Sequence, residues 1–234
     1  VGLLFTYETN RFIFSIMEIF ISIDGVLRNT IQKFDYHYND AYLDSELEEG
    51  NTFEYNKIGE VQNDNLLNYY KFQSIEEFEY FAYIEYPIEI FGHAGLSYST
   101  TFSDLHKLIY DNPQHNYTLV GLDEKGKAKP GSLFFLSKNG YLGNNIKFIT
   151  SDEIENTWNL CDVWISDNKK ILDTRTENKI GIKFSTAYNQ YFTNSLEIGK
   201  LTEIENICPN FTKTEKDTTL TLNQSQTDVE PEIQ

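Results

Sequence analysis

Short apolar segments alternate with short helical patterns along the second half of the chain, and this alternation restricts the fold more than any other feature of the sequence. The apolar segments lie at residues 117–120, 146–149, 163–165 and 180–184. A similar segment at residues 18–23 stops at Asp24-Gly25, a common turn pair. Strands that alternate with helices at short spacing are typical of βαβ units, so the sequence predicts an α/β fold with a parallel sheet.

Start and stop signals mark the helices between these strands. Ser74 and Glu77 form a capping box at the start of the clearest one. The predicted helices begin at residues 74, 101, 130, 152 and 169, and a closing helix covers residues 196–207. Residues 31–64 show no regular pattern, so the sequence predicts an irregular, partly helical insertion between the first strand and the rest of the sheet.

Composition and charge exclude several classes of protein. Hydrophobic residues make up 40% of the 234 residues and charged residues 24%, which excludes a wholly disordered chain. Nineteen Lys and Arg against 36 Asp and Glu give a net charge of −17, so duplex nucleic acid is not an expected partner. The two cysteines, Cys161 and Cys208, are too few for a disulfide framework, and we expect a cytoplasmic protein.

The two ends of the chain are expected to lie outside the folded domain. Residues 1–16 are apolar, but Glu8 and Arg11 interrupt them, and a membrane-spanning helix needs about 20 apolar residues. We therefore expect no membrane segment and interpret residues 1–16 as an extension before Met17, with a genuine N-terminal strand as the alternative. Residues 211–234 are rich in Thr, Gln and acids, which predicts a disordered acidic tail.

The segment Ile19 to Leu27, IFISIDGVL, resembles motif I of the haloacid dehalogenase (HAD) superfamily, where a strand ends in Asp-x-Asp-Gly. The second half resembles the 5′(3′)-deoxyribonucleotidase-like branch of that superfamily, because Ser166-Asp167, a short helix and the pair Tyr188-Asn189 follow in series. The resemblance spans residues 17–192. It implies a HAD-like Rossmannoid parallel sheet in the strand order 5-4-1-2-3, with residues 18–23 in the centre and an inserted, mainly helical cap.

The resemblance also divides the chain. It implies a HAD-like core formed by residues 17–30 and 114–210, and a cap formed by residues 31–113. The extension at residues 1–16 and the tail at residues 211–234 lie outside both parts.

The catalytic positions that the resemblance implies are only partly kept. In HAD phosphatases the first Asp of motif I is the nucleophile and a Mg²⁺ ligand, and the second Asp is the general acid/base. Here Ser22 occupies the nucleophile position and Asp24 the acid/base position. A serine hydroxyl is un-ionised at neutral pH, so the substitution removes the negative charge that holds the metal ion.

The remaining motifs depart from the pattern as well. The motif II hydroxyl falls near Gly121, and the motif III Lys has no clear equivalent, with Lys147 and Lys138 as substitutes. At motif IV, Ser166 replaces one acid and Asp167 is kept. The resemblance therefore implies Gly25, Gly121 and Lys147 as substrate-binding residues, and Asp24 with Asp167 as the residues that would hold a metal ion weakly.

Two classes of function stay open. The first is a HAD-like protein that has lost phosphatase activity and needs no cofactor. Such a protein would act by binding or as a structural or assembly component, with a protein partner at the Tyr/Phe-rich insertion. The second is a divergent Mg²⁺-dependent phosphohydrolase, nucleotidase-like, acting on a small phosphate ester. The composition and the pair Tyr188-Asn189 also suit a phage-encoded protein in the host cytoplasm or the virion.

Overall fold

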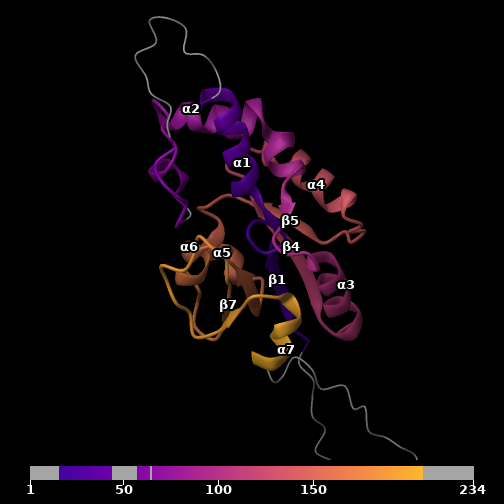
Figure 1. The fold of residues 1–234 in the computed structure, drawn as a ribbon. Helices are drawn as coiled ribbons and strands as arrows, with labels where there is room; N and C mark the ends of the chain where they lie inside the picture. The colour runs from indigo at the N-terminus through magenta and orange to yellow at the C-terminus, as the bar shows by residue number, and fades with distance from the viewer. Residues whose placement is uncertain (1–15, 44–56, 64, 208–234) are drawn as a thin grey trace, which may run out of the picture.

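The computed structural model describes residues 16–43, 57–63 and 65–207, and a six-stranded sheet forms its centre (Figure 1). The strands are β1 (Glu18–Ser22), β4 (Asn116–Leu122), β5 (Ile146–Ile149), β6 (Val163–Ser166), β7 (Ile180–Phe184) and β8 (Glu197–Ile198). Their order is β5-β4-β1-β6-β7-β8, and every neighbouring pair is parallel. The predicted α/β class and parallel sheet are confirmed.

The first strand lies where the sequence predicts it. β1 pairs with β4 on one side, with Ser22 next to Val120, and with β6 on the other, with Ile21 next to Ile165. The predicted order 5-4-1-2-3 corresponds to β7-β6-β1-β4-β5, and the structure adds β8 beyond β7. The carboxyl ends of β1 and β6 therefore lie side by side.

Strand β8 occupies the start of the predicted closing helix. Helical structure begins only with the 3₁₀ turn η5 (Leu201–Glu203) and continues in α7 (Ile204–Ile207). Upstream, the buried Lys183 donates to Glu197 Oε1 at 3.2 Å, and Asn194 Nδ2 donates to the Gly181 carbonyl at 2.7 Å. The Lys183 amide also donates to the Leu196 carbonyl at 2.9 Å, and the Ser185 amide to the Ile198 carbonyl at 2.8 Å. These bonds pair residues 197–198 with β7, so the prediction of a helix from Leu196 was wrong at its start.

Helices cover both faces of the sheet, with α3 (Thr101–Asp111) and α4 (Ala128–Lys138) on one side and α5 (Ile154–Trp158) and α6 (Lys169–Asp173) on the other (Figure 1). The alternation of side chains along β1 explains both layers. Ile19 and Ile21 belong to a buried cluster with Leu105 of α3. Phe20 belongs to a second cluster with Trp158 of α5 and Trp164 of β6.

A mainly helical insertion lies between β2 (Arg28–Asn29) and β3 (Gly95–Leu96), which pair antiparallel at its base. Its elements are α1 (Thr30–Tyr38), η1 (Asn39–Leu43), η2 (Leu66–Asn68), α2 (Ile75–Tyr80), η3 (Phe81–Glu85) and η4 (Ile88–Gly92). Among the described residues, η1, η3 and η4 are π-helical. Buried aromatic side chains give the insertion a cluster of its own, including Phe34, Tyr38, Tyr70 and Phe81.

The domain boundaries stay predictions. Helix α3 lies inside the predicted cap of residues 31–113, but its buried apolar side chains belong to the cluster on the sheet. The extension at residues 1–16, except for its last residue, and the tail at residues 211–234 lie outside the described residues. Within the described part of the chain, no helix combines the length and apolarity that crossing a membrane requires.

The insertion packs closely on α4. A Cβ atom on Gly131 of α4 would come within 2.7 Å of the Pro87 carbonyl and 3.0 Å of Phe91 Cβ. On the opposite side, a Cβ atom on Gly92 would come within 3.0 Å of the Phe134 ring. The two glycines let η4 and α4 approach each other, and this contact fixes the insertion above the carboxyl ends of the strands.

Candidate functional site

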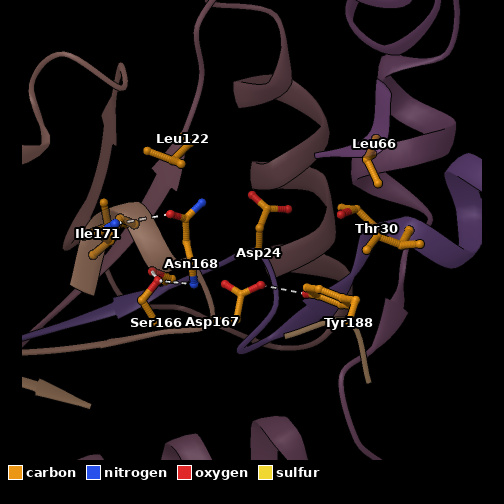
Figure 2. Close-up of a pocket in the computed structure, with 12 residues that line it drawn as sticks. Asp24, Thr30, Leu66, Leu122, Ser166, Asp167, Asn168, Ile171 and Tyr188 are labelled. Carbon is orange, nitrogen blue, oxygen red and sulfur yellow. Dashed lines mark hydrogen bonds between the residues drawn. The ribbon is translucent and has the colours of Figure 1, made fainter. Parts of the chain in front are cut away.

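A pocket of about 140 Å³ lies at the carboxyl ends of β1, β4 and β6, beneath the insertion (Figure 2). Ser22, Asp24 and Asp167 all line it, and Thr30 and Leu66 line it from the insertion. The structure therefore brings together the three residues that sequence analysis placed in the nucleophile, acid/base and motif IV positions. Ligands of open α/β sheets bind at this end of the strands.

Neutral hydroxyl groups stand where the resemblance implies acids. The buried Ser22 Oγ donates a hydrogen bond to Ser166 Oγ at 2.9 Å and accepts one from Trp164 Nε1 at 3.1 Å. Ser166 Oγ in turn accepts from the Asn168 amide at 3.2 Å. A serine nucleophile needs an adjacent base to remove its proton, but the proton of Ser22 points to another hydroxyl group.

Arg28 holds Asp24 through two hydrogen bonds. Its Nε donates to Asp24 Oδ1 at 2.7 Å and its Nη2 to Asp24 Oδ2 at 3.0 Å. The Arg28 side chain is fully buried, whereas that of Asp24 is one-third exposed. A third bond runs from Arg28 Nη1 to the Phe91 carbonyl at 2.7 Å, and the guanidinium lies over the Phe91 ring at 5.2 Å. Both oxygens of Asp24 thus bind a permanent cation.

Asp167 is positioned by the Tyr188-Asn189 pair that the sequence singled out. Tyr188 donates to Asp167 Oδ2 at 2.7 Å, and Asn189 Nδ2 donates to the Asp167 carbonyl at 3.1 Å. Burial, and next the charge of Asp167, raise the pKa of Tyr188 well above its ordinary value, so the phenol stays protonated as a donor.

Gly25 is required beside Asp167. Its φ of +74° is favourable only for glycine, and a Cβ atom there would come 1.9 Å from Asp167 Cγ. The Gly25 amide donates to the Arg28 carbonyl at 2.9 Å, and Ser97 Oγ donates to the Gly25 carbonyl at 2.7 Å. The turn after β1 therefore brings Asp24 and Asp167 to the same pocket.

The structure does not bring Gly121 and Lys147 to this pocket. β4 contributes Val120 and Leu122 to the wall, and side chains alternate along a strand. Gly121 therefore faces the other side, where a Cβ atom would come within 2.9 Å of the Phe148 ring. Lys147 lies on the edge strand β5, paired with Val120, and is not among the lining residues. The pocket geometry gives no support to substrate contacts by these two residues.

The donor set does not fit the Mg²⁺ ion that the resemblance implies. Mg²⁺ prefers carboxylate oxygens, but Ser22 and Ser166 offer neutral hydroxyl groups, and both oxygens of Asp24 bind Arg28. In the part of the chain that the structure describes, no group of three or more His, Cys, Asp or Glu side chains could hold a metal ion. Weak metal binding by Asp24 and Asp167 stays a prediction.

Comparisons with known proteins bear on the fold. No protein-family model and no curated protein matches the sequence. A haloacid dehalogenase-like hydrolase from Streptococcus pneumoniae matches in structure with a TM-score of 0.56 and 12% identity, over 82% of this chain and 98% of that one.

Two further structures match less well. A HAD-like hydrolase from Xanthomonas campestris has a TM-score of 0.47 and 8% identity, over 84% of this chain and 96% of its own. A putative HAD-like hydrolase from Burkholderia xenovorans LB400 has a TM-score of 0.48 and 8% identity, over 84% and 99%. On the strength of the Streptococcus pneumoniae match, the chain has a HAD-like fold, as the sequence predicted.

Proposed function

We propose that this chain is a HAD-like protein that has lost phosphatase chemistry and acts by binding. The paired contact of Arg28 with Asp24 carries the proposal. A general acid/base must take up and release a proton at one of its oxygens. Both oxygens of Asp24 accept from a buried guanidinium that does not deprotonate in proteins, so proton transfer would require breaking that contact.

The nucleophile position supports the same conclusion. The HAD reaction forms an aspartyl-phosphate, which needs a carboxylate, and Ser22 has a hydroxyl group bonded to Ser166 and Trp164. None of the described residues that line the pocket is Lys, Arg or His, so no lining side chain would neutralise the charge developing on a transferring phosphoryl group. In the described pocket, the nucleophile, acid/base and charge-neutralising positions therefore all support the proposed loss of phosphatase chemistry.

The alternative is a divergent Mg²⁺-dependent phosphohydrolase, nucleotidase-like, and one observation favours it. Asp24 and Asp167 line a single pocket, as two acids of an active HAD site would.

A phage-encoded origin, with the protein in the host cytoplasm or the virion, belongs to the proposal of a binding or assembly role. A protein partner would meet the exposed Tyr80 and Ile84 of the insertion, since most of its Tyr and Phe side chains are at least partly buried.

An activity assay tests the proposal. We expect the purified chain, with Mg²⁺, to hydrolyse p-nitrophenyl phosphate and deoxynucleoside monophosphates no faster than the Asp24→Asn variant does. The reason is that losing the nucleophile of a covalent mechanism leaves only residual catalysis. Turnover by the unmodified chain that Asp24→Asn abolishes would reject the proposal in favour of the divergent phosphohydrolase.

A further inference from the structure

A second pocket adjoins the one described above. It measures about 180 Å³ and shares Asp24, Thr30, Leu66 and Leu122 with the first, so the two pockets adjoin, and together they are here called the composite cleft. In Figure 2, Leu122 lies on the side of the sheet, Thr30 and Leu66 lie on the side of the insertion, and Asp24 lies between them. The first pocket is the polar half of the composite cleft, and the second is its apolar half.

Aromatic side chains of the insertion enclose the apolar half. Phe34 and Phe78 line it with ring centroids 5.5 Å apart. Tyr83 and Phe91 line it as a stacked pair with centroids 5.3 Å apart. Aromatic side chains in a pocket wall favour a flat apolar ligand, since aromatic pairs gain energy from offset or edge contacts.

The polar half offers hydrogen-bonding groups that carry no charge. Ser22, Ser166 and Asn168 line it, together with Thr30 at the boundary between the halves. Hydroxyl and amide groups bind neutral donors and acceptors, and a few such groups at one end of an apolar pocket fix a ligand's orientation.

The electrostatics of the composite cleft disfavour anions. None of the described residues that line either half is Lys, Arg or His, and the nearby Arg28 donates to Asp24 and to the Phe91 carbonyl. Burial raises the pKa of Tyr83, and carboxylates, Asp24 first, raise it further. The charges of Asp167 and Asp24 also raise the pKa of Tyr188, for which burial is the largest cause. The lining therefore offers carboxylates and no cationic side chain to an anionic ligand, and like charges disfavour its binding.

The walls of the composite cleft are held in place before any ligand arrives. Arg28 connects the turn after β1 to the Phe91 carbonyl of η4, and Gly131 lets η4 pack directly on α4. Binding to a preformed site avoids the cost of ordering its walls.

We propose that the composite cleft binds a small molecule that is neutral or positively charged, with a flat apolar body in the aromatic half and a hydrogen-bonding head in the polar half. This inference rests on the proposed loss of phosphatase function and names the class of ligand for the same site. A phosphate ester does not fit, because its dianionic head would lose hydration in a cleft whose described lining includes no cationic side chain to neutralise it. The nearby Arg28 already donates to Asp24 and to the Phe91 carbonyl.

Three probes with one body and different heads test the ligand class. Benzyl alcohol, benzylamine and benzyl phosphate share a benzyl group and carry a neutral, a cationic and an anionic head. In NMR titrations of the full chain without metal, we expect benzyl alcohol and benzylamine to bind with a Kd on the order of 1 mM. We expect benzyl phosphate to bind at least tenfold more weakly, because nothing neutralises its head.

Two neighbouring leucines provide a matched pair of variants. Leu66 lines both halves of the composite cleft, whereas Leu67, the next residue of the same 3₁₀ turn, lines neither and is partly exposed. Leu66→Trp should fill the space and weaken benzyl alcohol binding at least tenfold, and Leu67→Trp should leave it unchanged. If Leu66→Trp does not fold, nuclear Overhauser contacts from the probe to the methyl groups of Ala82 and Leu122 in the unmodified chain decide the location.

The outcomes separate this inference from the proposed function. Tightest binding by benzyl phosphate, no binding by either other probe, binding that Leu66→Trp leaves intact, or missing contacts to Ala82 and Leu122 would each overturn the ligand class. A chain that binds none of the probes and hydrolyses no phosphate ester would refute this inference alone. Metal-dependent hydrolysis would refute the proposed function as well.

Discussion

Arg28→Met is expected to lower the free energy of unfolding by about 3 kcal/mol, since removing one partner of a buried ion pair costs roughly 3–5 kcal/mol and Asp24 is partly solvated. The variant also leaves the Phe91 carbonyl without its bond from Nη1. For a chain of this size the loss corresponds to a fall in Tm of about 6–12 °C, measurable by calorimetry.

Two control variants accompany the measurement on Arg28→Met. Lys107→Met breaks an exposed ion pair with Asp111 and should cost less than about 1 kcal/mol. The double variant Arg28→Met/Asp24→Asn should recover part of the loss, because it no longer leaves a carboxylate without its cation. A fall of less than about 1 kcal/mol for Arg28→Met would show that the pair with Asp24 does not hold the site together.

Ser22→Asp is expected to destabilise the chain by about 1–3 kcal/mol at pH 7, because it places a carboxylate at a buried position. Burial would raise the pKa of that carboxyl above its ordinary value near 4. The unfolded chain then ionises first as pH rises, so the part of the loss that comes from the charge is absent below about pH 4, grows through the pH range up to the raised pKa, and stays constant above it.

Urea unfolding of Ser22→Asp from pH 4 to pH 8 measures this dependence, and Ser22→Asn is the neutral control of the same shape. We expect Ser22→Asn to show no such pH dependence, and Mg²⁺ to leave the stability of Ser22→Asp unchanged. We also expect Ser22→Asp to gain little hydrolysis, since its dianionic substrate would still meet no cation. A Ser22→Asp chain that Mg²⁺ stabilises and activates would show an intact metal site.

Much of the fold follows from local patterns. The apolar segments and turn signals specify five strands, and the alternation with helices specifies parallel pairing, while the HAD resemblance supplies their order. β8 was not predictable in this way, because a two-residue strand has no periodicity of its own. It depends on pairing with β7 and on the bond from Lys183 to Glu197, which both require β7 to be in place.

The candidate site was only partly predictable. Ser22, Asp24 and Asp167 follow from strand ends, which parallel pairing brings together. Arg28 was missed, since an arginine in a loop is usually solvated, and its burial depends on Phe91, 63 residues away. The prediction that Gly121 binds substrate did not take into account that side chains alternate along β4. This alternation brings Val120 and Leu122 to the pocket instead.

The most direct test of the central claim, that this pocket does not assemble a catalytic metal site, is a titration with Mn²⁺ monitored by electron paramagnetic resonance. Mn²⁺ takes the same oxygen ligands as Mg²⁺, and Asp167→Asn controls for ions attracted by the net charge of −17. We predict no saturable Mn²⁺ site below about 1 mM in the unmodified chain or in Asp167→Asn. One tightly bound Mn²⁺ per chain that Asp167→Asn removes would contradict the account.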